Sequence, residues 1–386
     1  DVVLLPSKVH VSIQFLDVPV STHPPAHRPV DAPVVPPGSF GAPGLDTVNA
    51  GLVQLHADPG AFPWLVADIG GTNARFGWVG GAAGTVEHVR KLSVPQHAGP
   101  AEAVRTYLGE LADTLGNSFQ APRRGAFAVA STIAGDRVAL TNSHWDFSTA
   151  GVRTELGLDG LVVMNDFEAL ALSLPHLQAS QLRCHGAAPQ PHGTLCVIGP
   201  GTGLGVAGIT ETARGWVALP GEGGHATLAP IDDFEADLLS HVRRHYDHVS
   251  AERLLSGIGL PVLHGAVAAV TGAPTGSALP AEEIVARGLS GQDACCRQTL
   301  ETFCALLGSF AGNVALTLGA RGGVYIGGGI VPRLGDLFFA SAFRARFEAK
   351  GRFSSYLQPI PTALITDTLV ALTGAAAAIR QRPAGR

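Results

Sequence analysis

A strand–glycine turn–strand pattern that occurs twice constrains the fold of this chain more than any other feature. The two copies are residues 64–79 and 194–209. In each copy a short apolar run leads into a glycine turn, and a second apolar run follows, as expected of two buried strands joined by a hairpin. Gly71 and Thr72 of the first copy are matched by Gly201 and Thr202, 130 positions later. The repeat predicts two halves with the same architecture.

Helix signals lie between and after the two hairpins. Residues 169–174 have a helical pattern that Pro175 stops. Residues 290–293 fit a capping box, and the periodic apolar pattern that follows predicts a long helix to about Leu318, ended by Gly319. Strands and helices in both halves predict an α/β fold with mixed sheets.

Length and composition allow two domains with sizeable cores. The chain has 386 residues, of which 46% are hydrophobic and 15% charged. The net charge of -5 and the scattered basic residues argue against nucleic acid or an anionic membrane as the main partner. The five cysteines contain no C-x-x-C and indicate reduced thiols in a cytoplasmic protein. We find no stretch that is apolar and long enough to span a bilayer, and no secretory signal.

Residues 1–60 differ from the rest of the chain. They hold ten of the 27 prolines, which remove backbone donors and prevent regular ladders. We therefore expect a mostly disordered extension. The alternative is a packed arm in which residues 2–5 and 11–16 add an edge strand. The expected domains are a small α/β domain of residues 61–176 plus 367–386 and a large α/β domain of residues 177–366.

The first candidate site follows the first apolar run. Asp68 ends the strand, and Gly70 and Gly71 form the turn. Glycines expose N–H groups that suit phosphate oxygens, and an aspartate beside phosphates suits a magnesium ion, directly or through water. An ordinary tight hairpin would have the same sequence pattern.

The second candidate site is the glycine-rich run at residues 199–205. It is not a dinucleotide-binding fingerprint, because Leu204 stands where that motif needs glycine and a strand follows instead of a helix. A P-loop is also excluded, since the chain contains no Gly-Lys dipeptide. A second phosphate-binding hairpin remains, and two such hairpins across a cleft could hold a nucleotide's phosphates from both sides.

The third candidate site is Asn165-Asp166, where the predicted strand 161–164 gives way to a helix. Ligands of open α/β folds bind at this edge of a sheet, and an aspartate there could accept the proton of a substrate hydroxyl. Both residues are also good helix N-caps, although one of them would suffice for capping.

Three further polar residues have both a functional and a structural interpretation. Glu222 and His225 flank two glycines, which makes a helical metal site improbable. In a loop they could bind sugar hydroxyls, or His225 could be structural. Glu252 follows Ser250, a candidate N-cap, and an acid in a first helical turn needs no ligand to explain it.

Taken in order, these motifs resemble those of bacterial glucokinases. The resemblance rests on residues 65–75, 165–167, 199–205, 220–225, 250–253, 327–333 and 350–353. It covers residue 62 to the C-terminus, and residues 1–60 have no counterpart.

The resemblance implies a two-domain actin-like (ribonuclease H-like) ATPase fold and the transfer of the γ-phosphate of ATP to the 6-hydroxyl of glucose. Asp166 would be the general base. Asn165, Asp166, Glu222, His225 and Glu252 would bind glucose. ATP would lie against Ala67, Asp68, Ile69, Gly70, Gly71, Thr72, Asn73, Gly201, Thr202, Gly203, Gly327, Gly328 and Gly329. Asp68 would help to place Mg²⁺.

Related sugar kinases with a structural zinc have a cysteine cluster soon after the Glu-Gly-Gly-His segment. Residues 226–230 and beyond have none, so no structural zinc is expected. We also expect a homodimer. Two alternatives stay open: a kinase for another hexose, and a sugar-sensing regulator of the same fold. The regulator would need a DNA-binding module, which residues 1–60 lack. The sequence leaves the hexose and the phosphoryl donor open.

Overall fold

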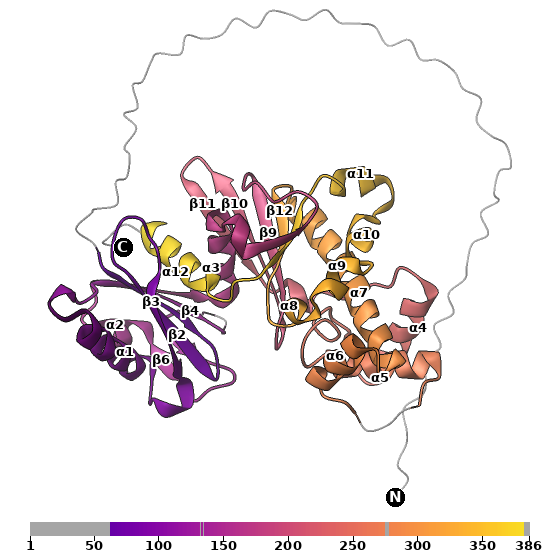
Figure 1. Ribbon diagram of the computed structural model, residues 1–386, viewed down its shortest axis with the longest axis horizontal. Coiled ribbons are helices and arrows are strands. Elements are labelled where there is room, and N and C mark those ends of the chain that lie inside the picture. The colour runs from indigo at the N-terminus through magenta and orange to yellow at the C-terminus, as the bar shows by residue number, and fades with distance from the viewer. Residues whose placement is uncertain (1–61, 132, 134, 275–277, 382–386) are drawn as a thin grey trace, which may run out of the picture. The chain divides into compact units, whose positions relative to one another are not determined.

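The computed structural model describes residues 62–131, 133, 135–274 and 278–381 (Figure 1). These residues belong to a single compact unit. The predictions for residues 1–60 fall outside the described residues.

The first sheet has the strand order β3-β2-β1-β4-β7. Its strands are β1 (Trp64–Ile69), β2 (Asn73–Val79), β3 (Glu87–Ser93), β4 (Arg124–Val129) and β7 (Gly160–Asn165). β2 pairs antiparallel with β1 and β3, whereas β4 is parallel to both β1 and β7. A short ribbon of β5 (Arg137–Ala139) and β6 (Asp146–Ser148) lies outside this sheet.

The second sheet repeats this plan, with the order β11-β10-β9-β12-β13-β8. Its strands are β8 (Leu182–His185), β9 (Thr194–Pro200), β10 (Leu204–Thr212), β11 (Gly215–Gly221), β12 (Gly323–Ile326) and β13 (Thr362–Ile365). β10 is antiparallel to β9 and β11, and β12 is parallel to β9 and β13. The predicted duplication and the mixed sheets are therefore confirmed.

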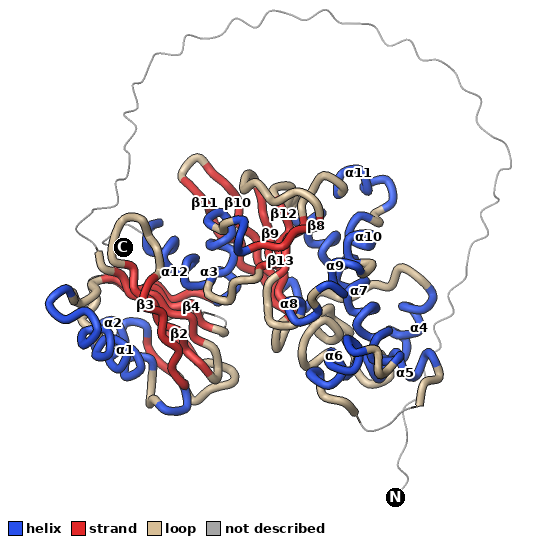
Figure 2. The backbone as a smooth tube through the Cα atoms, in the orientation of Figure 1, coloured by secondary structure: helices blue, strands red, loops and turns tan. Residues whose placement is uncertain are grey.

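Twelve α-helices are present in the described residues, besides short 3-10 turns (Figure 2). They are α1 (Pro100–Leu115), α2 (Thr149–Glu155), α3 (Asp166–Ser173), α4 (Asp233–Val242), α5 (Leu260–Thr271), α6 (Ala281–Ser290), α7 (Ala294–Leu318), α8 (Val331–Leu334), α9 (Asp336–Ala340), α10 (Phe343–Glu348), α11 (Ser354–Leu357) and α12 (Val370–Gln381).

Alternation along β1 sorts its side chains between two cores. Leu65 and Ala67 pack with residues of α1, whereas Trp64 and Val66 pack with residues of α3 and α12. The cluster that contains α3 and α12 also includes Leu195 and other residues of the second sheet. Helices α3 and α12 therefore share one core with both sheets, and they lie side by side in Figure 1.

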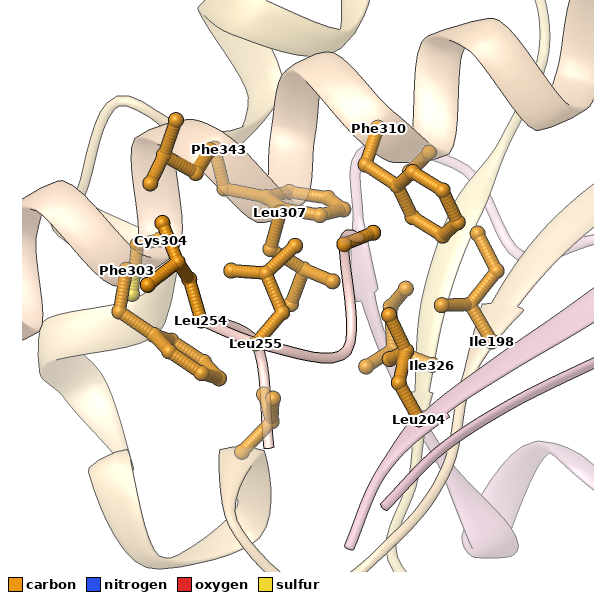
Figure 3. Packing of buried hydrophobic residues seen from close by; sticks show 14 of the residues in the cluster. Ile198, Leu204, Leu254, Leu255, Phe303, Cys304, Leu307, Phe310, Ile326 and Phe343 are labelled. Carbon is orange, nitrogen blue, oxygen red and sulfur yellow. The ribbon is translucent and has the colours of Figure 1, made fainter. Parts of the chain in front are cut away.

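The third core packs around α7, on the other face of the second sheet. Figure 3 shows Leu254, Leu255 and Leu307 of α7 in one cluster, which also includes Ile198 of β9. By length and composition α7 could span a membrane, with a mean hydropathy of 1.3 in a window that is 78% buried inside this fold. The expectation that no stretch is long and apolar enough is therefore wrong on those two criteria. The apolar run occurs because α7 is packed on many sides.

Two expectations about helix starts are also wrong. The cap of α7 is Asp293, whose Oδ1 accepts a hydrogen bond from the N–H of Cys296 at 2.9 Å, so the helix begins after the proposed capping box. Residues 250–253 form turns, although the Ser250 hydroxyl does accept a bond from the N–H of Arg253 at 3.3 Å. The Ser250 hydroxyl thus makes the hydrogen bond expected of a helix cap, but the bond closes a turn and no helix begins there. Gly319 does end α7, with a left-handed φ of 63°.

Candidate active site

Each predicted glycine hairpin forms a turn closed by its own backbone. The N–H of Gly70 donates to the carbonyl of Asn73 at 2.9 Å, and the N–H of Gly201 donates to the carbonyl of Gly203 at 2.9 Å. The reasons for glycine differ between them. A Cβ on Gly71 would lie 2.6 Å from the carbonyl oxygen of Asn142, so packing within the protein explains this glycine. A Cβ on Gly201 would approach no protein atom more closely than 4.0 Å.

Asn165 and Asp166 stand at the end of β7 and the start of α3, as predicted. Asn165 is the N-cap, and its Oδ1 accepts a hydrogen bond from the N–H of Phe167 at 2.8 Å. Its side-chain amide donates to the carbonyl of Ser131 at 3.2 Å. Since Asn165 caps the helix, capping does not require the carboxylate of Asp166, whose Oδ1 also accepts from the N–H of Phe167 at 3.0 Å.

Two cavities meet at Asp166. The first, of about 300 Å³, is lined by Asp68, Arg75, Asp166, Phe167, Leu170, Gly327, Gly328, Gly329, Pro332, Ile365, Thr366, Asp367, Thr368, Val370 and Ala371. The second, of about 580 Å³, is lined by Arg75, Asp166, Gly201, Thr202, Gly257, Leu260, Ala281, Glu282, Val285, Gly329, Ile330 and Arg333. The structure thus brings Asp68, Asp166 and the glycines of both later motifs together, whereas residues 70–73 line neither cavity.

Burial disfavours the ionised forms of the two carboxyl groups at this junction, those of Asp68 and Asp166. Burial and the nearby charge of Asp68 raise the pKa of Asp166 to about 6, although hydrogen bonds from the backbone of Phe167 and Asp166 and from the Asn165 side chain oppose the rise. Burial also raises the pKa of Asp68, against the opposing effect of Arg75, which forms an ion pair with it at 3.0 Å. A carboxyl group with a pKa near 6 is suited to accept a proton at neutral pH.

Glu252 and His225 lie together, but outside the lining of both cavities. Glu252 Oε1 is 3.8 Å from His225 Nε2, and Glu252 Oε2 accepts a hydrogen bond from the N–H of Leu204 at 2.8 Å. Glu252 is therefore not a helix-start acid, and it supports the β9–β10 hairpin. Glu222 is exposed beside this pair, and its backbone bridges to Val206 of β10.

The glycines of the cavities leave room for a ligand with phosphates. A Cβ on Gly329, as on Gly201, would point into open space. Gly328 has a φ of 75°, and a Cβ there would lie 2.3 Å from the carbonyl oxygen of Pro200, so the close approach of two turns explains it. Bare backbone facing an open cavity is what a nucleotide's phosphates need.

Among the described residues near Asp166, the side chains that could bind a metal ion are few, and all of them would do so through oxygen. In the part of the chain that the structure describes, no three His, Cys, Asp or Glu residues cluster as a ready-made site. The first cavity does present the carboxylates of Asp68, Asp166 and Asp367. Magnesium commonly binds one or two carboxylates, water and substrate phosphates, so these residues fit it better than they fit zinc.

Several lining residues were not singled out from the sequence. Arg75 and Phe167 belong to recognised motifs but were given no role. Asp367 was missed entirely, although it follows the carboxyl end of the buried strand β13. That position relative to the sheet is the signal that could have identified it.

A duplicated mixed sheet with a glycine-lined cavity beside a partly buried carboxylate defines a class of protein, the phosphotransferases of the actin-like ATPase fold. Comparisons with known proteins specify the family. The glucokinase family model matches residues 65–382. A glucokinase from Chromobacterium violaceum is 49% identical over 85% of this chain and 92% of its own length, and one from Aromatoleum aromaticum is 50% identical over 84% and 96%. The crystal structure of a glucokinase from an Antarctic psychrotroph superposes with a TM-score of 0.76 at 37% identity, covering 83% of this chain and 99% of that one.

The chain belongs to the glucokinase family. It is an ATP-dependent hexose kinase.

Proposed function

We propose that this glucokinase uses Asp166 as the general base when it transfers the γ-phosphate of ATP to the 6-hydroxyl of glucose. The single observation that carries this proposal is the position of Asp166, where the two cavities meet. Asn165 caps helix α3, so the cap does not require the carboxylate of Asp166. Burial and the charge of Asp68 raise the pKa of Asp166 to about 6.

The reaction then needs one proton transfer and one displacement. The Asp166 carboxylate accepts the proton of the 6-hydroxyl while the oxygen attacks the γ-phosphorus. The bond from that phosphorus to the β–γ bridging oxygen breaks, which releases ADP. Because phosphoryl transfer depends on in-line positioning and charge neutralisation, a fixed base and two ligand-sized cavities meet its requirements.

The phosphates of ATP are assigned to the side of the cavities formed by Gly201, Thr202 and Gly329. The open space beside two of these glycines and the Thr202 hydroxyl support this assignment. The family resemblance implies that Gly327, Gly328 and Gly329 line the adenosine side. We keep that assignment for Gly327 and Gly328, and we assign Gly329 to the phosphates because it lines the same cavity as Gly201 and Thr202. The assignment of residues 67, 69–73 and 203 to the nucleotide rests on the family resemblance alone.

A bound Mg²⁺ would neutralise charge on the transferring phosphate. Asp68 would hold it, directly or through water, and the ion pair with Arg75 favours the ionised form of Asp68 that this requires.

Glucose hydroxyls are assigned to Asn165, Glu222, His225 and Glu252. The 3.8 Å approach of His225 to Glu252 supports a shared role for those two residues. The homodimer, the cytoplasmic location and the division into domains 61–176 plus 367–386 and 177–366 stay predictions.

The test compares the turnover of Asp166→Asn with that of the matched variant Asp233→Asn. Both aspartates are the first residue of a helix, α3 and α4 respectively, and Asp233 is exposed. Loss of a general base should lower kcat by about 10²–10⁴-fold, and the control should retain wild-type kcat. Equal kcat values for Asp166→Asn and wild type would overturn the assignment. A panel of hexoses and phosphoryl donors, run on the wild type, would show whether glucose and ATP are preferred.

A further inference from the structure

Phe167 lies on a pair of facing glycines in the second hairpin. Gly199 and Gly205 are direct cross-strand partners in the β9–β10 ladder. A Cβ on Gly199 would lie 2.4 Å from Cζ of Phe167, and a Cβ on Gly205 would lie 2.1 Å from its Cε2. Real Cβ atoms do not come this close, so the ring occupies a slot that exists only because both strands carry glycine at that level.

The same residue holds Asp166 through its backbone. The N–H of Phe167 donates to Oδ1 of Asp166 at 3.0 Å and to Oδ1 of Asn165 at 2.8 Å. Movement of the Phe167 backbone would therefore displace both side chains at the start of α3. The ring fixes one end of this connection to the second sheet, while the amide fixes the other end to the carboxylate.

Helix α3 is held from its other side as well. A Cβ on Gly374 of α12 would lie 1.7 Å from the carbonyl oxygen of Ala169, so the two helices are in backbone contact there. With α12 behind it and the glycine slot in front of it, α3 has little freedom to shift along or away from the second sheet.

We propose that Phe167 is a positioning residue, which sets the place of Asp166 relative to the β9–β10 hairpin that carries Gly201 and Thr202. This inference rests on the proposed function, since it matters for turnover only if Asp166 accepts the substrate proton. The hairpin holds the donor phosphate and the carboxylate receives the acceptor's proton. A displacement of one relative to the other by about 1 Å can cost 10²-fold in rate.

The test begins with Phe167→Leu, compared with Phe119→Leu. Phe119 is another partly buried phenylalanine, stacked on Trp78 at 5.8 Å between ring centroids and outside both cavities. Both variants lose packing and should melt at lower temperature. Phe167→Leu alone should lower kcat, by about ten- to a hundredfold, with a smaller change in the KM for glucose. It should also move the acid limb of the pH–rate profile to lower pH, because water gains access to Asp166.

A double-mutant cycle isolates the contact itself. Gly205→Ala forces a methyl group into the ring and should lower kcat by a similar factor. In Phe167→Ala/Gly205→Ala the ring is absent and leaves room for the methyl group, so the double variant should be no slower than Phe167→Ala alone. If the two losses in kcat multiply, or if Phe167→Leu changes neither kcat nor the acid limb, the proposal is wrong. The Phe167→Leu comparison alone decides if Gly205→Ala does not fold.

Asp166→Asn, measured alongside, separates this inference from the proposed function. Loss of turnover in Asp166→Asn with unchanged kcat in the Phe167 variants would overturn the positioning role only. Retention of turnover in Asp166→Asn would overturn the base assignment and the positioning role with it.

Discussion

Acidification through pH 6 should remove the activity of this enzyme while the protein stays folded. The general base must be ionised to accept the proton of the glucose 6-hydroxyl. Burial, and next the charge of Asp68, raise the pKa of Asp166 from an ordinary 3.8 to about 6. The active fraction of the enzyme should therefore fall as pH decreases through that value.

The expected size of the effect follows from the ionised fraction. With a pKa of about 6, roughly one-tenth of Asp166 is ionised at pH 5, so kcat/KM for glucose should be about one-tenth of its value on the neutral plateau. With the ordinary value of 3.8, more than about nine-tenths would be ionised at pH 5 and the rate would scarcely change.

The assay is a discontinuous measurement of ADP between pH 4.5 and 8.5, which avoids coupling enzymes that fail in acid. Tryptophan fluorescence at each pH controls for unfolding. Asp68→Asn should lower the overall rate and also move the acid limb to lower pH, because the charge that raises the pKa of Asp166 is gone. A rate that stays level from pH 7.5 to pH 5 in the folded wild-type enzyme would refute the reasoning.

Further changes have separate expected outcomes. Asp166→Asn should raise the free energy of unfolding at pH 8 by about 1–3 kcal/mol. Because the pKa of Asp166 is raised in the folded protein, the wild type loses stability as pH rises from about 4 to 6, and the variant does not. The gain should be absent in thermal melts at pH 3.5, where Asp166 is mostly protonated in both states. Thr202→Val should raise the KM for ATP more than that for glucose, and the reverse pattern would assign the hairpin to the sugar. Glu252→Gln should raise the glucose KM and cost about 1–3 kcal/mol in kcat/KM, the range expected when one hydrogen bond to a charged group is lost; a lower melting temperature with both KM values unchanged would leave it only a structural role, such as its bond to the N–H of Leu204. Deletion of residues 1–60 should leave activity and melting temperature nearly unchanged, and a truncated protein that fails to fold would show that the segment packs on the rest.

The sequence was most informative for features that depend on residues close together in the chain, such as hairpin turns and helix caps. The two hairpins could be found because each needs a short apolar run and a glycine turn, and β1 and β9 begin at residues 64 and 194, as the repeat predicted. The capping signal at Asn165 was equally local, and the structure shows that it leaves Asp166 available. The same reasoning failed at residues 250–253, because a hydroxyl that closes a turn has the same pattern as a helix cap.

The contacts that complete the site join residues far apart in the chain. Glu252 supports the N–H of Leu204, which lies 48 positions away, and Phe167 fills a slot between two glycines on strands of the other sheet. Both side chains could be named from the sequence, but their partners depend on how the two sheets pack on α3. Asp367 was missed for a related reason, since strand β13 is short and its place beside β12 is fixed only by pairing.

The most direct measurement of the central claim is ³¹P nuclear magnetic resonance of the products that the enzyme forms from ATP and glucose. The account predicts ADP and glucose 6-phosphate in equal amounts, with the phosphate ester on the 6-hydroxyl, and formation of both slowed about 10²–10⁴-fold in Asp166→Asn. Phosphate on another hydroxyl, ADP formed without a sugar phosphate, or an undiminished rate in Asp166→Asn would contradict it.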